Sequence, residues 1–122
     1  MEGLSVRCAP ARARAFAEKC VALRARLDAV LGTHGVLLFP SHPTVAPPHN
    51  LPLYRIPNFS YTALFNVLLM PATQVPTGMH ALGMPLGVQV VGARGRDVVT
   101  IAVACRLEQL LGGWHAPAAA RG

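Results

Sequence analysis

The sequence predicts an α/β fold, a mixed sheet covered by helices, and predicts that this fold is incomplete on its own. Segments with helical and with strand-like apolar patterns follow one another along the 122 residues. Charged residues make up only 13% of the chain, against about 25% in a typical soluble domain. A chain so poor in polar cover is either associated with a membrane or a piece of a larger fold. Its apolar elements favour the second alternative, a piece of a larger fold.

The first expected element is an amphipathic helix over residues 11–31. Its apolar residues recur at helical spacing and form a stripe of Phe16, Cys20, Leu23, Leu27 and Val30. Arg12, Lys19 and Arg26 border this stripe, where their stems can cover apolar surface while their charges reach water. Gly32 supplies a stop signal for the helix.

A strand and a proline-rich loop are expected next. The apolar run of residues 36–39 predicts a strand buried on both faces, as in a parallel or mixed sheet. Residues 40–57 contain six prolines, which excludes a helix or a central strand there. We expect an ordered, irregular loop that docks through its interspersed apolar side chains.

The next elements are a short helix and a pair of strands. Asn58 or Ser60 is expected to cap a helix that runs to about Leu69 and is ended by Pro71. Strands follow at 72–75 and 86–91. The loop between them is expected to include Gly78, Gly83 and Pro85.

A last helix is predicted from Asp97, as its N-cap, through Leu111, with Gly112 closing it. It is apolar on nearly every side, which is typical of a helix buried in a larger assembly. Together the elements predict one domain segment over residues 11–117. An N-terminal tail of residues 1–10 and a C-terminal tail of residues 118–122 flank it.

Charge and cysteine usage narrow the classes of partner and compartment. The net charge of +6 comes from ten arginines and one lysine, but no interleaving with aromatic residues appears, so no nucleic-acid partner is expected. Cys8, Cys20 and Cys105 are odd in number and widely spaced, which indicates a reducing, intracellular setting. The sequence shows neither a signal peptide nor a transmembrane run. Association with a membrane surface or with a second copy of the chain stays open.

Residues of the types that catalyse hydrolysis are present without a recognisable arrangement. Ser41 and Ser60 lie outside any nucleophile elbow, and we interpret them as a turn residue and a helix cap. Cys105 lies in the apolar last helix, so a neutral core thiol is expected. His42 and His49 share a loop, but two histidines do not complete a metal site, and no metal or cofactor is predicted.

Several ordered motifs resemble those of the amidase-signature family. Residues 61–72 carry Tyr-Thr-x-Leu-Phe-Asn followed by Pro-Ala, and residues 83–92 read Gly-Met-Pro-Leu-Gly-Val-Gln-Val-Val-Gly. Asp97 and the Gly-Gly-Trp of residues 112–114 follow in the family's order. Phe-Pro-Ser-His-Pro-Thr-Val-Ala-Pro, at 39–47, is most similar to the fatty-acid amide hydrolase type 2 branch.

The resemblance implies a large α/β fold and hydrolysis of amides through an acyl-enzyme formed by a triad of Ser, cis-Ser and Lys. In the family these residues lie upstream of the matching segment, and nothing here matches them. We therefore expect a C-terminal fragment with no catalytic residue, inactive alone. Joined to an N-terminal part, it is expected to act on a fatty-acid amide or similar small amide.

By matching position, the resemblance also implies substrate-binding residues. Ile56, Phe59 and Ala63 would form a wall of the acyl-chain pocket, and their spacing of three and four places them on one helical face. Ordinary core packing is the alternative for all three. Asn66 and Gln89, polar residues in apolar segments, are each expected to hydrogen-bond neighbouring backbone.

Three functions stay open on the sequence alone. The leading hypothesis is the C-terminal portion of a serine amidohydrolase that hydrolyses fatty-acid amides to fatty acid and amine. The second is a non-catalytic protein, derived from that fold, that binds a partner or a lipid. The third is a complete small enzyme that uses Cys105 or Ser60, which stoichiometric labelling coupled to amide hydrolysis would reveal.

Overall fold

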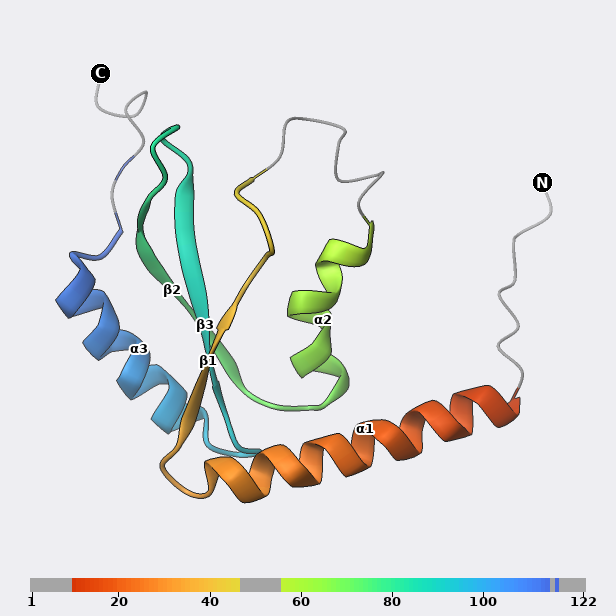
Figure 1. Cartoon of the computed structure of the whole chain (residues 1–122). Coiled ribbons are helices and arrows are strands. Elements are labelled where there is room, and N and C mark those ends of the chain that lie inside the picture. The colour runs from red at the N-terminus through yellow and green to blue at the C-terminus, as the bar shows by residue number, and fades with distance from the viewer. Residues whose placement is uncertain (1–9, 47–55, 115, 117–122) are drawn as a thin grey trace.

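The computed structural model describes residues 10–46, 56–114 and 116 (Figure 1). Its elements are α1 (Pro10–Leu31), β1 (Val36–Pro40), the 3₁₀ turn η2 (Ile56–Phe59), α2 (Ser60–Val67), β2 (Ala72–Met79), β3 (Pro85–Gly92) and α3 (Asp97–Leu111). The predicted α/β class is confirmed, because helices pack on both faces of a sheet. Figure 1 shows α3 and α2 on opposite sides of the strands, with α1 crossing below them.

The three described strands form an antiparallel sheet in the order β1-β3-β2. Val91 of β3 pairs with Leu37 on one side and with Ala72 on the other. The expectation that the first strand is buried on both faces was wrong. β1 lies at the edge of this sheet, and Leu38 is 52% exposed because α3 packs on β2 and β3.

One face of the sheet carries the core beneath α2 and α1. Its buried members are Phe65, Leu68, Met70 and Val91, against which Cys20, Leu27, Leu31, Leu37, Phe39 and Leu64 pack. Alternate residues of a strand point to opposite faces, so Leu37 and Phe39 of β1 both reach this core. The Phe39 ring meets the Phe65 ring edge-on, with centroids 5.1 Å apart.

The other face is covered by α3. Val75, Val90 and Ala104 form its buried core, and Val36, Val88, Val103 and Leu107 pack around it. Thr100 is the buried polar member of this layer. Its Oγ1 accepts a hydrogen bond from Thr73 Oγ1 at 2.9 Å and donates to the Asp97 carbonyl oxygen at 2.8 Å. These bonds join β2 to the first turn of α3.

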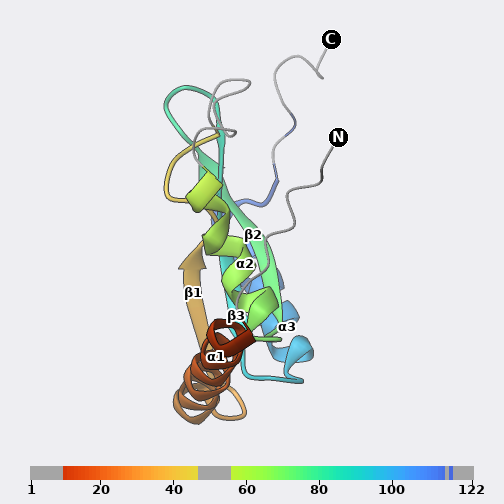
Figure 2. The same cartoon turned by 90° about the vertical axis from the view of Figure 1, so that its right-hand side faces the viewer.

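The predicted first helix is confirmed, and it begins at Pro10, a residue suited to the first turn of a helix. Its stripe is only partly covered. Leu27 and Leu31 pack against the core, and the Asp28 carboxylate accepts a hydrogen bond from the Arg94 amide at 3.0 Å. Phe16 remains 60% exposed, because the N-terminal part of α1 extends past the sheet (Figures 1 and 2).

The start of α2 differs from the prediction. Neither Asn58 nor Ser60 is its N-cap; Phe59 takes that position, because the 3₁₀ turn η2 leads directly into the helix. The Thr62 hydroxyl donates to the Phe59 carbonyl oxygen at 3.0 Å. The predicted caps were wrong because a preceding turn supplies the helix entry that a side chain was expected to supply.

The end of α2 lies two residues before the predicted one, and a Schellman motif forms it. The Met70 amide donates to the Phe65 carbonyl oxygen at 3.0 Å, and the Leu69 amide donates to that of Asn66 at 3.1 Å. Leu69 adopts φ 54°, a left-handed conformation that bulky side chains disfavour. Met70 can therefore turn inward toward the core while Leu69 points into solvent.

The β2–β3 hairpin is longer than predicted. Gly78 and Pro85 lie within the strands and not in the loop between them, and the pairing shifts register between Pro76 and Gly78. A proline can extend β2 because this strand lies at the sheet edge, where its missing N–H breaks no ladder bond. The expected loop shrinks to a turn over residues 80–84, in which Gly83 has φ +75°.

The last helix has the predicted bounds and closes at Gly112, in the left-handed conformation. Arg96 is the N-cap, so the prediction for Asp97 was wrong by one position; Asp97 is the acidic residue of the first turn. Cys105 is exposed, which corrects the expected core thiol, since α3 turns only one face toward the sheet. Val98, Ile101 and Leu110 lie on its exposed surface.

Candidate functional site

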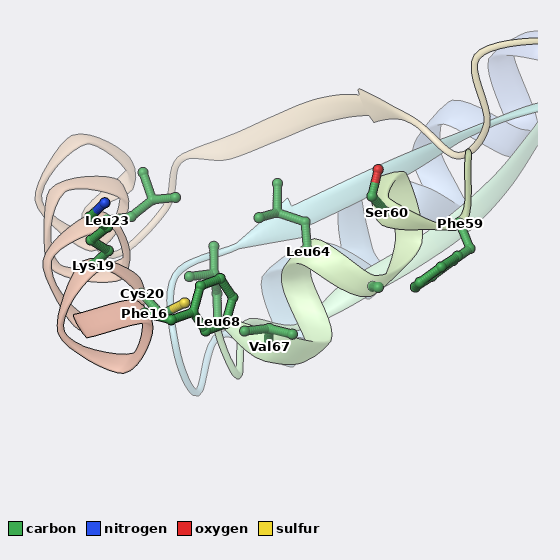
Figure 3. Close-up of a pocket in the computed structure, with 10 residues that line it drawn as sticks. Phe16, Lys19, Cys20, Leu23, Phe59, Ser60, Leu64, Val67 and Leu68 are labelled. Carbon is green, nitrogen blue, oxygen red and sulfur yellow. The ribbon is translucent and has the colours of Figure 1, made fainter. Parts of the chain in front are cut away.

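A groove of about 370 Å³ lies between α1 and α2. This volume is in the range of small-molecule sites. Two helices form its walls, and Figure 3 shows Phe16 and Cys20 of α1 next to Val67 and Leu68 at the end of α2. They are Phe16, Lys19, Cys20 and Leu23 from α1, Phe59 at the end of η2, and Ser60, Ala63, Leu64, Val67 and Leu68 from α2 and its C-cap.

Helical spacing explains why these residues meet. Phe16, Cys20 and Leu23 recur at four and three along α1, so they lie on one side of that helix. The α2 wall repeats the same periods. Leu64 and Leu68 reach down to the core, while Phe59 and Val67 remain exposed at the rim. The groove is thus an open extension of the core on the α1/α2 face.

The structure brings two of the three predicted substrate-binding residues into this groove, Phe59 and Ala63. Ile56 begins η2, but its side chain lies outside the described part of the structure. The α1 wall was not predicted as a site, although its stripe was recognised. Phe16 could have indicated this wall, because it is a large apolar residue on the stripe. It lies far from the C-terminal end of α1, which packs against the core.

The prediction that Gln89 and Asn66 hydrogen-bond neighbouring backbone has a different outcome for each residue. Gln89 is buried at the centre of the sheet, and its Nε2 donates to the carbonyl oxygens of Tyr61 at 3.3 Å and Pro40 at 3.4 Å. The expectation of backbone partners is confirmed for Gln89. For Asn66 it was wrong: the residue is exposed, and among the described residues its side chain makes no hydrogen bond to backbone, because that side of α2 faces away from the sheet.

A second hollow, of about 810 Å³, lies between residues 41–46, the hairpin and the end of α3. It contains His42 and Glu108, and Trp114 stands at its edge. The Ser41 hydroxyl hydrogen-bonds Gln74 Oε1, and His42 Nδ1 lies 2.8 Å from the Thr44 carbonyl oxygen. This histidine is held by a local turn and is not hydrogen-bonded to Ser41 in the way that a base is held by a nucleophile.

Within residues 10–46 and 56–114, no three His, Cys, Asp or Glu residues cluster in a way that could hold a metal ion. His49 lies outside the described residues. None of the described helices is long and apolar enough to span a bilayer. Lys19 and Ser60 share the groove but stand on opposite walls (Figure 3), so they do not form a Ser–Lys catalytic pair.

Known proteins are similar to this chain in sequence and in fold. The sequence pattern of the Amidase family matches residues 6–101. Fatty-acid amide hydrolase 2 of Homo sapiens is 53% identical over 95 residues, which cover 78% of this chain and 18% of that protein. Fatty-acid amide hydrolase 2-A of Danio rerio is 48% identical over 95 residues, with the same coverage.

The match extends to a more distant enzyme and to a solved structure. The 6-aminohexanoate-cyclic-dimer hydrolase of Paenarthrobacter ureafaciens is 46% identical over 52 residues, 43% of this chain and 10% of that protein. A crystal structure described as an amidase superposes with a TM-score of 0.70 and 32% identity, over 81% of this chain and 25% of that one. This chain spans less than a fifth of the length of its fatty-acid amide hydrolase relatives. The chain belongs to the amidase family.

Proposed function

We propose that this chain is the C-terminal portion of a serine amidohydrolase that cleaves fatty-acid amides to fatty acid and amine. In this role it supplies three strands, their covering helices and the α1 and α2 walls of the acyl-chain groove. The observation that carries the proposal is the apolar groove between α1 and α2, which holds both Phe59 and Ala63. The identity of about half with the fatty-acid amide hydrolases 2 supports this substrate class.

The catalytic triad belongs, in this proposal, to the portion of the relatives that this chain does not match. Alone the chain is expected to lack amidase activity. Its only lysine, Lys19, is exposed on α1, and among the described residues it makes no hydrogen bond to a serine. Ser41 hydrogen-bonds Gln74, an amide that cannot act as a general base. Cys105 is exposed on α3, on the sheet face opposite the groove.

A chimaera tests this proposal directly. The chain replaces the matching stretch of human fatty-acid amide hydrolase 2, and hydrolysis of a long-chain primary amide is measured for the chimaera and for the isolated chain. We expect the chimaera to be active and the isolated chain to be inactive. Activity of the isolated chain, or a folded chimaera without activity, would overturn the proposal.

Filling the groove tests the acyl wall within the same chimaera. Ala63→Trp places a large ring in the groove, and we expect it to raise KM for a long-chain amide about tenfold or more while leaving a short-chain amide nearly unchanged. Ala102→Trp is the matched control, since Ala102 is exposed on α3. Equal effects of Ala63→Trp on the long and the short amide would show that the groove does not hold the acyl chain.

The second candidate function is a non-catalytic protein, derived from this fold, that binds a partner or lipid. The exposed apolar residues of α3 and of α1 favour it. The same residues would be buried if a larger domain packs on them. Analytical ultracentrifugation and thermal melting of the isolated chain separate the two. A soluble monomer with a cooperative melt supports the binding protein, whereas aggregation supports the hydrolase portion.

A further inference from the structure

We propose that the groove between α1 and α2 prefers an anionic amphiphile, a long-chain carboxylate, over the corresponding neutral amide. The inference rests on the proposed function for the acyl groove, and it adds a charge preference that the acyl groove alone does not require. The determinant is Lys19, whose ammonium would pair with the carboxylate at the rim. In an intact hydrolase such a groove would retain the acid product more tightly than the amide substrate.

The interior of the groove suits an alkyl chain. Eight of its ten lining residues are apolar or sulfur-containing, and only Lys19 and Ser60 carry polar side-chain groups. Phe16 and Phe59 are each 60% exposed, so an occupant would remove both rings from water. Burial of apolar surface on both sides of a chain supplies the attraction, at about 25 cal/mol per Å². This part of the binding is the same for an acid and for an amide.

One charged side chain, that of Lys19, is among the residues that line the groove. Lys19 stands on the α1 wall beside Leu23 (Figure 3), and Arg12 and Arg26 lie two helical turns to either side of it along the same border of the stripe. All three are exposed. Among the described residues Lys19 makes no ion pair, and the carboxylate of Asp28 is engaged by the Arg94 amide. Arg12 and Arg26 do not line the groove, so Lys19 is the charged side chain that a head group in the groove would meet.

The preference is expected to be modest because the rim is open to solvent. An exposed pair between an ammonium and a carboxylate contributes little, and we expect about a fivefold tighter binding of the acid than of the amide. Salt should reduce this ratio, since exposed charges are screened over about 10 Å at 0.1 M ionic strength. A cationic amphiphile of equal length should bind less tightly than either.

Cysteine chemistry offers a readout within the chain itself. Cys20 lines the groove, whereas Cys105 is exposed on α3. In the chimaera, carrying Cys8→Ser and with its amidase activity abolished so that dodecanamide is not hydrolysed, iodoacetamide labelling of Cys20 and Cys105 is followed by peptide mass spectrometry. The added amphiphiles are dodecanoate, dodecanamide or dodecyltrimethylammonium, each below its micelle concentration. We expect dodecanoate to protect Cys20 at about fivefold lower concentration than dodecanamide, with no protection of Cys105.

Charge variants isolate the role of Lys19. Lys19→Gln should abolish the difference between dodecanoate and dodecanamide, and Lys19→Arg should keep it. Arg106→Gln is the matched control, because it removes one positive charge from an exposed position on α3 and should leave the ratio unchanged. Circular dichroism of each variant establishes that the fold is retained.

Three outcomes would overturn the proposal. Equal protection by acid and amide removes the charge preference, while the acyl groove and the proposed function would stand. A ratio lowered equally by Lys19→Gln and Arg106→Gln would assign the effect to net charge. Protection of Cys20 that depends on protein concentration and not on amphiphile would make a second copy the occupant. The chimaera assay judges the hydrolase function separately in each case.

Discussion

The two faces of the sheet are covered in different ways. On one face a single long helix, α3, lies along β2 and β3 and seals Val75 and Val90 from solvent. On the other, α1 and the short α2 both pack against the core, and a groove lies between them. A helix that lies flat on a sheet excludes solvent along its length, whereas two helices that meet over a sheet leave a hollow beside their contact. The candidate site lies on the face with two helices.

The largest expected effect separates the core of the α1/α2 face from its groove. Phe65→Ala should lower the free energy of unfolding by about 3–5 kcal/mol, because the buried ring leaves a cavity. Phe16→Ala, the same change in the exposed groove wall, should cost less than about 0.5 kcal/mol. Urea denaturation followed by circular dichroism measures both. Similar losses would mean that the groove is part of the core.

A substitution at Gly92 tests how closely α3 packs on the sheet. A Cβ there would lie 2.7 Å from Thr100 Cγ2, so Gly92→Ala should destabilise the fold by about 1–3 kcal/mol. Thr100→Ser removes the obstructing methyl group and keeps the hydroxyl. The double variant should therefore recover part of the loss in thermal denaturation. If it recovers none, the cost comes from the backbone of Gly92 and not from the contact with α3.

The hydroxyl bond between β2 and α3 has a smaller expected contribution. Thr73→Val removes the donor to Thr100 Oγ1 and should lower the free energy of unfolding by about 1 kcal/mol. Thr62→Val is a control on α2, where the hydroxyl serves an exposed turn. Chemical denaturation compares the two variants. An equal or larger loss for Thr62→Val would contradict the tighter packing of the α3 face.

The smallest expected effect is a gain on the α1/α2 face. Leu69→Gly should raise the free energy of unfolding by about 0.5 kcal/mol, because glycine adopts φ 54° without the cost that leucine meets there. Leu69 is 62% exposed, so little packing is lost. Leu69→Ala keeps the backbone cost and should give no gain. A stability loss for Leu69→Gly in differential scanning calorimetry would show that the exposed leucine contributes packing.

Periodicity predicted the long helices well. The bounds of α1 and α3 follow from apolar spacing and from Gly32 and Gly112, because these signals are local. The hairpin was predicted too short, since Pro76 excludes only a central strand and nothing local states that β2 lies at an edge. The predicted side-chain caps were wrong for both helices. Phe59 and Arg96 are the N-caps instead, because other backbone geometries can begin a helix equally well.

One wall of the candidate site was predicted from the sequence and the other was not. Phe59 and Ala63 were found through the family resemblance, which reports positions along the chain. The opposite wall came only from the structure, because a contact between α1 and α2 joins residues far apart in sequence. The spacing of apolar residues within one helix indicates which side is buried, but not which other element packs against that side. Cys105 was predicted to be buried and is exposed, since an apolar helix lying on a sheet buries one side only.

The amide of Gln89 has a consequence for how this family can vary. It binds the carbonyl oxygens of Pro40, at the end of β1, and Tyr61, in the first turn of α2, and so holds together the two ends of the intervening stretch of chain. With its ends held by a residue of the central strand, the length of that stretch affects stability weakly, by about 0.6 kcal/mol for each doubling. We therefore expect insertions and deletions between these two anchor points to change the stability of the sheet only slightly.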